Sequence, residues 1–98
     1  MRIKIDLDDS VNPIVFIRRT GYAEIKDFRS GQTSYIRRLR GYHYPRFHIY
    51  IEDGYFNLHL DQKAPSYEGT SAHSGEYEGR VVEEEAKRIE EFLLKYKK

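Results

Sequence analysis

Hydrophobic and polar residues alternate most regularly over residues 46–61, in the run RFHIYIEDGYFNLHLD. Alternation with a period of two is typical of a strand that buries one face. The pair Asp53-Gly54 interrupts the alternation, and it favours a two-residue turn because a type I′ turn needs positive φ at both central positions. The run therefore predicts a β-hairpin in which His48 lies directly opposite His59.

The predicted hairpin has two chemically different faces. Its apolar face consists of Phe47, Ile49, Ile51, Phe56, Leu58 and Leu60. Its polar face consists of His48, Tyr50, Asn57, His59 and Asp61. A register shift by one residue would mix the two sets, so the burial pattern favours the register given above.

Three further segments predict strands, and a fourth is ambiguous. Residues 2–7 alternate like a half-buried strand, and residues 14–19 begin with four apolar residues that predict a central strand. Residues 22–28 predict a weaker strand, which could pair with 14–19 as a second hairpin. Residues 35–40 fit either a strand or a short helix, because no clean face emerges from their alternation.

The clearest helical pattern covers about residues 80–96, where one apolar stripe follows helical spacing. The stripe consists of Val82, Ala86, Ile89, Leu93 and Tyr96. Before it, residues 62–79 form a long loop that contains Gly, Ser and Pro and exceeds the usual loop length of compact domains. Residues 1–98 thus predict a single α+β domain. It would have an antiparallel β-sheet of hairpins, with about four to five strands, and one C-terminal α-helix packed on one face.

Composition narrows the possible functions. The 98 residues include no cysteine, which excludes disulfides and thiolate zinc sites. No apolar run approaches the roughly 20 residues of a membrane span, and the first residues lack the apolar core of a signal peptide, so we expect a cytoplasmic protein without membrane association. The net charge of +1 hides an asymmetry, because residues 1–50 hold ten basic and five acidic residues and residues 51–98 hold seven and eleven.

The polar face of the hairpin predicts a metal site. His48 and His59 are paired, Asp61 shares their face, and His73 lies on a loop long enough to fold back. Three imidazoles and a carboxylate suit zinc or another divalent first-row ion. The leading hypothesis is therefore a small divalent-metal protein, with hydrolysis as a candidate reaction. The residues expected to line the site are Tyr50, Asn57, Tyr77 and Glu78.

Two alternatives involve nucleic acid. Two histidines can divide into acid and base, with Lys63 or an arginine stabilising an anionic transition state, as in a metal-independent ribonuclease. Residues 35–50 also interleave basic and aromatic side chains, which suits binding of single-stranded RNA. The candidate contact residues are Arg37, Arg38, Arg40, Tyr42, Tyr44 and Arg46.

Two simpler readings of the polar face remain open. Tyrosine and arginine are enriched in protein interfaces, so the exposed sheet face could join two copies of the chain as a homodimer. The same residue types are also ordinary on the solvent-exposed side of an antiparallel sheet, where they would have no chemical role.

Overall fold

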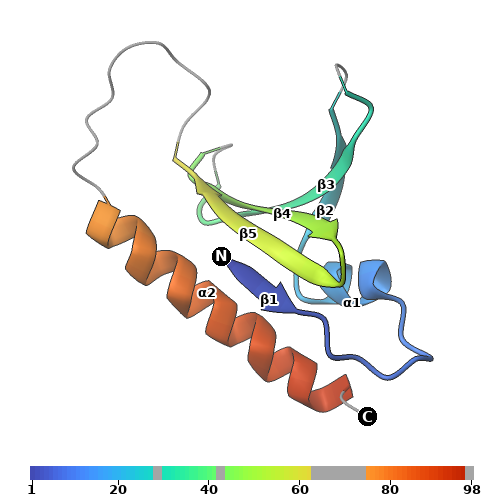
Figure 1. Cartoon of the computed structure of the whole chain (residues 1–98). Coiled ribbons are helices and arrows are strands. Elements are labelled where there is room, and N and C mark those ends of the chain that lie inside the picture. The colour runs from blue at the N-terminus through green and yellow to red at the C-terminus, as the bar shows by residue number, and fades with distance from the viewer. Residues whose placement is uncertain (28–29, 42–43, 63–74, 97–98) are drawn as a thin grey trace.

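The computed structural model describes residues 1–27, 30–41, 44–62 and 75–96, with backbone alone at 75–78 (Figure 1). Five strands form one antiparallel sheet in the order β1-β5-β4-β3-β2. The strands are β1 (Arg2–Lys4), β2 (Ala23–Lys26), β3 (Thr33–Arg38), β4 (Arg46–Glu52) and β5 (Tyr55–Asp61). The helices of the described residues are α1 (Pro13–Arg19) and α2 (Gly75–Tyr96). The predicted α+β class, with an antiparallel sheet and a C-terminal helix, is confirmed.

The central hairpin has the predicted register. β4 and β5 pair with His48 opposite His59. The turn between them has φ values of 52° at Asp53 and 81° at Gly54, as the type I′ geometry requires. The local sequence was therefore enough to sort the side chains of this hairpin onto two faces.

The apolar side of the sheet is covered by both helices. Figure 1 shows α2 lying along the sheet on the side of β5 and β1. The middle of its predicted stripe is buried, at Ala86, Ile89 and Leu93, in a core that includes residues of β4 and β5. Phe16 of α1 stacks on Phe56 of β5 with ring centroids 5.8 Å apart. The opposite side of the sheet is left for the polar residues.

The strand predicted over residues 14–19 is wrong, because this segment forms the helix α1. The side chain of Asn12 caps the helix by accepting a hydrogen bond from the Ile14 amide at 2.7 Å, and Pro13 occupies the first helical position. Only Phe16 and Ile17 are buried, so the four-residue apolar run faces both core and solvent. The second hairpin is wrong for the same reason.

The remaining predictions concern the pairing of β2, the segment 35–40 and the start of α2. β2 pairs with β3 instead of with residues 14–19, and the ambiguous segment at 35–40 belongs largely to strand β3. α2 begins at Gly75, earlier than the predicted residue 80, so the long loop expected over 62–79 ends sooner. The rest of that loop, residues 63–74, lies outside the described residues.

A buried carboxylate connects α2 to the sheet. The side chain of Glu85 is only 2% exposed and accepts hydrogen bonds from three residues. The Tyr22 hydroxyl lies 2.6 Å from Oε2, and Arg37 and Arg88 each donate two hydrogen bonds of 2.8–3.0 Å. Burial alone raises the pKa of Glu85, but the hydrogen bonds from Arg88, Arg37 and Tyr22 together outweigh it and hold the pKa below its usual value. Glu85 is therefore charged at neutral pH.

Replacing Glu85 by alanine should strongly destabilise the fold. The change leaves Arg37 and Arg88 without their carboxylate, and losing one partner of a buried ion pair costs about 3–5 kcal/mol. We expect the free energy of unfolding to fall by about 3 kcal/mol, because both guanidinium side chains are 31% exposed and regain some hydration. Chemical denaturation measures the loss, and Glu84→Ala, at an exposed neighbouring position, should change stability by less than about 0.5 kcal/mol.

The contribution of Glu85 should also depend on pH. Its pKa is lower in the folded than in the unfolded chain, so the stabilisation is present above the unfolded value of about 4.5 and is lost as pH falls through the folded value. The stability difference between the wild-type chain and Glu85→Gln should therefore shrink as denaturation is repeated below about pH 4.5. A difference that stays constant down to pH 3 would show that the charge of Glu85 does not matter.

Candidate functional site

The open face is the face of the sheet opposite α2. Its central residues are Ser34, His48, Tyr50, Asn57, His59 and Asp61. β4 and β5 supply five of them through the hairpin register, and β3 supplies Ser34. The structure thus places the five residues of the predicted polar face on the same side of the sheet as a serine from a third strand.

His48 is held at both ring nitrogens. Its Nδ1 lies 3.0 Å from Oδ2 of Asp61, and its Nε2 lies 2.7 Å from Oγ of Ser34. The hydrogen bond from His48 lowers the pKa of Asp61 and, with Arg46, outweighs the opposing effect of burial. Because the Asp61 carboxylate is charged, it accepts a hydrogen bond from Nδ1–H of His48. When the ring carries its proton on Nδ1 alone, Nε2 accepts a hydrogen bond from the Ser34 hydroxyl.

The sequence did not predict Ser34 as a site residue, because it precedes the ambiguous segment 35–40 and belongs to a polar run, residues 29–34, that is typical of a loop. Once β3 is a strand, Ile36 lies opposite His48, and Ser34, two positions away, must share that face. The available signal was the short alternation around Tyr35, which faces Ile49 on the core side. Reading residues 33–38 as a strand would have placed a hydroxyl beside the histidines.

His59 lies beside this group. The Tyr50 ring packs against both histidines, with centroids 4.6 Å from His48 and 6.0 Å from His59. Partial burial lowers the pKa of His59, and the positive charge of the amino terminus lowers it further, against the smaller opposing effect of the Asp61 and Glu52 carboxylates. The ring of His59 is therefore neutral at pH 7 and offers one donor and one acceptor.

The predicted metal site stays a prediction. Among the described residues, no group of three His, Asp or Glu side chains is arranged to hold a metal ion. His73 lies outside those residues, so the full set of His48, His59, Asp61 and His73 cannot be assembled from them. A metal on Nε2 of His48 would have to replace the hydrogen bond to Ser34.

Of the four predicted lining residues, the structure describes the side chains of two. Tyr50 and Asn57 lie on the open face, where the Asn57 amide donates to Glu52 at 3.1 Å. The backbone of Tyr77 and Glu78 belongs to the first turns of α2, and their side chains are outside the description.

Arg37, one of the predicted RNA contacts, lies on the core side of the sheet. Its guanidinium binds Glu85 and lies 5.3 Å from the ring centroid of Phe47. Because side chains alternate along β3, Arg37 lies on the face of the sheet that Ser34 does not share. Arg37 therefore serves the helix–sheet contact, and the structure does not bring it to the open face.

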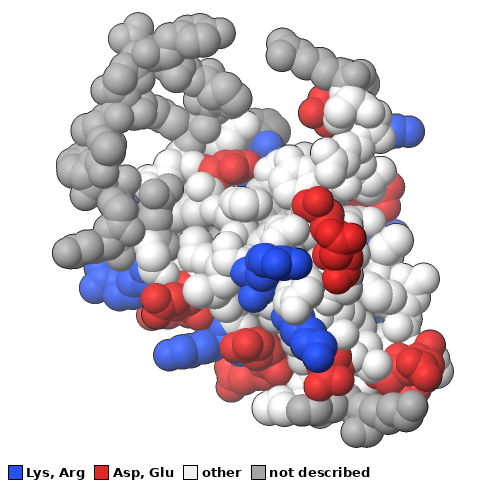
Figure 2. Space-filling view, viewed as in Figure 1, with Lys and Arg blue, Asp and Glu red and all other residues white. Residues whose placement is uncertain are grey.

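The other candidate contacts for RNA have the following surroundings in the described part of the chain. Arg46 donates to Asp61 at 3.3 Å and stacks over Tyr44 at 4.6 Å. Arg38 and Arg40 are exposed, and Tyr42 lies outside the described residues. Basic and acidic side chains are also interspersed over the side of the molecule seen in Figure 2. RNA binding stays a prediction.

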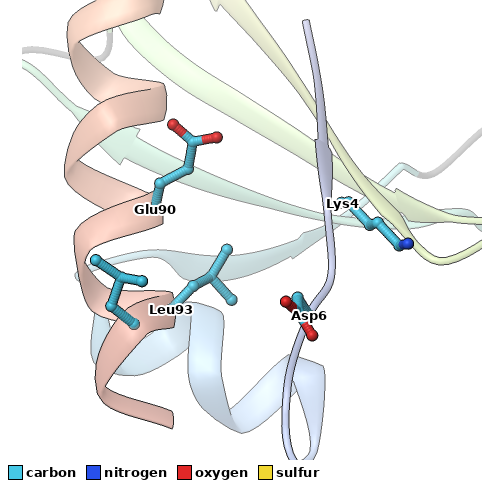
Figure 3. Close-up of a pocket in the computed structure, with 5 residues that line it drawn as sticks. Lys4, Asp6, Glu90 and Leu93 are labelled. Atoms are coloured by element: carbon cyan, nitrogen blue, oxygen red, sulfur yellow. The ribbon is translucent and has the colours of Figure 1, made fainter. Parts of the chain in front are cut away.

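A cleft of about 250 Å³ lies elsewhere, between the end of β1 and α2 (Figure 3). Its lining residues are Lys4, Asp6, Glu90, Leu93 and Leu94. Among its described lining residues there is no histidine and no hydroxyl side chain, and its ionisable groups are the Lys4 amine and the Asp6 and Glu90 carboxylates.

Comparison of the chain with protein families, curated proteins and solved structures finds no match in any of the three. Within the described part of the chain, no helix combines the length and the apolar character needed to cross a bilayer. The functional argument therefore depends on the geometry of the open face.

The neutral state of His59 can be tested by NMR titration of its ring proton. We expect a midpoint below the usual value of about 6.5, because partial burial and neighbouring positive charge disfavour the imidazolium. The same chain unfolded in urea is the control, and there the midpoint should rise. A folded midpoint equal to or above the unfolded one would contradict this assignment.

Proposed function

We propose that the protein is a metal-independent hydrolase that uses Ser34 as nucleophile and His48 as general base. Asp61 orients His48 and stabilises its protonated form. The observation that carries the proposal is the continuous hydrogen-bonded chain from Asp61 through both nitrogens of His48 to Ser34, with distances of 3.0 and 2.7 Å. A nucleophile, a base and an orienting carboxylate within hydrogen-bond reach are the recurring elements of acyl-transfer sites.

The reaction proceeds in two stages. Oγ of Ser34 attacks the carbonyl carbon of an ester while its proton passes to Nε2 of His48, and that proton then goes to the departing alcohol. In the second stage His48 takes a proton from water, which attacks the acyl group, and the proton returns to Oγ as the carboxylic acid leaves. Asp61 stays charged throughout and offsets the positive charge that forms on the imidazole in each stage.

Burial of the serine limits the size of the substrate. Ser34 is only 3% exposed, and the His48 side chain beside it is 13% exposed. An acyl group therefore reaches Oγ only by displacing neighbouring side chains. Esters of small acids, such as acetate, fit this constraint better than esters with bulky acyl groups.

Hydrolysis of p-nitrophenyl acetate in EDTA tests the proposal. Ser34→Ala and His48→Asn should each lower kcat by about 10³-fold or more, because members of such a triad act as a unit. Thr33→Ala is the matched control, since it removes a hydroxyl from an exposed position next to Ser34, and it should leave kcat unchanged. An organophosphate probe should add one covalent group to the wild-type chain at Ser34.

Three other results of this assay would contradict the proposal. Hydrolysis that survives in Ser34→Ala, without labelling of Ser34, would assign the activity to a histidine and refute the serine nucleophile. Activity that disappears in EDTA and returns with Zn²⁺ would instead favour the metal site predicted from His48, His59, Asp61 and His73. If there is neither turnover nor labelling, the hydrogen bonds that join Asp61, His48 and Ser34 have a purely structural role.

A further inference from the structure

The outer edge of β2 has no neighbouring strand in the described sheet. β2 is the last strand in the order, and its residues are exposed except for Ile25, which is half-buried. The other edge strand, β1, lies beside α2, where Lys4 and Leu93 line the same cleft. β2 is therefore the more accessible edge for adding another strand.

The hydrogen bonds of β2 show which backbone groups point outward. The Asp27 amide donates to Gln32 at 2.9 Å, so Ile25, two residues earlier, also bonds toward β3. Glu24 and Lys26 alternate with these residues, and their amide and carbonyl groups must point away from β3. The Leu39 amide donates a hydrogen bond to the Pro45 carbonyl, on the side of β3 that faces β4. This agrees with the alternation of inward and outward backbone groups.

We propose that this edge pairs with β2 of a second copy of the chain, antiparallel and about a two-fold axis at Ile25. In this register Glu24 lies opposite the partner's Lys26, and Lys26 lies opposite the partner's Glu24. The outward backbone groups of these residues form four hydrogen bonds, and the two Ile25 side chains meet on the open face. The proposal is independent of the hydrolase activity.

Charge selects this partner and this register. Antiparallel pairing shifted by two residues would set Glu24 against Glu24, or Lys26 against Lys26, and like charges directly opposite destabilise a sheet. A charged edge generally discourages pairing with unrelated strands. Here the same charges become complementary when the partner is an identical strand related by two-fold symmetry.

The pairing would join two open faces into one. Ser34 is the cross-strand neighbour of Ile25, so the row across the joined sheets reads Ser34, Ile25, Ile25 and Ser34. Three strand spacings separate the two serines, or about 14 Å. The paired edge would thus place two copies of the polar group on one continuous surface.

Sedimentation equilibrium with charge-swapped variants tests the pairing. Pairing through one short strand of each chain makes a small interface, so the wild-type chain is measured up to about 1 mM. We expect its average mass to rise toward that of a dimer. Glu24→Lys alone and Lys26→Glu alone should stay monomeric, because each homotypic pairing opposes like charges.

Mixing the two variants supplies the decisive arm. A Glu24→Lys chain carries two lysines at this edge and a Lys26→Glu chain carries two glutamates, so the mixture should regain the dimer. The double variant Glu24→Lys/Lys26→Glu should also dimerise like the wild type. A wild-type chain that is monomeric at about 1 mM, or variants that all dimerise equally, would overturn the proposal.

Discussion

The charged carboxylate of Glu85 is the constraint on which the rest of the structure depends. A charge removed from water must find its hydrogen bonds inside the protein, and here three donors come from three parts of the chain. Tyr22 precedes β2, Arg37 belongs to β3, and Arg88 lies one turn along α2. Satisfying all three at once sets the rotation of α2 against the sheet and fixes which side of β3 faces the core.

The orientation of β3 toward Glu85 also determines which of its residues lie on the open face. Successive residues of a strand point in opposite directions, so a β3 that turns Arg37 toward Glu85 must turn Ser34 away from it. Ser34 then meets His48 from the next strand at 2.7 Å. The polar group is consequently a product of two independent requirements, the hairpin register and the burial of Glu85.

The sequence predicted what is determined locally and missed what depends on distant partners. The hairpin register followed from Asp53-Gly54 and its flanking alternation, and the helix stripe followed from periodicity over one segment. The roles of Arg37 and Ser34 depend on partners 48 and 14 residues away. The error at α1 was of another kind, because a short apolar run fits helix and strand equally, and the capping pair Asn12-Pro13 was the signal that separates them.

The double anchoring of His48 has a consequence for how the site responds to a proton. In the neutral ring Nε2 accepts from the Ser34 hydroxyl, whereas the imidazolium donates from both nitrogens and the same hydroxyl oxygen becomes an acceptor. Gaining a proton therefore reverses the direction of one hydrogen bond without breaking either. The open face can exchange a positive charge while its heavy atoms keep their positions, so the rearrangement that usually accompanies a change of charge is confined to the turning of a single hydroxyl.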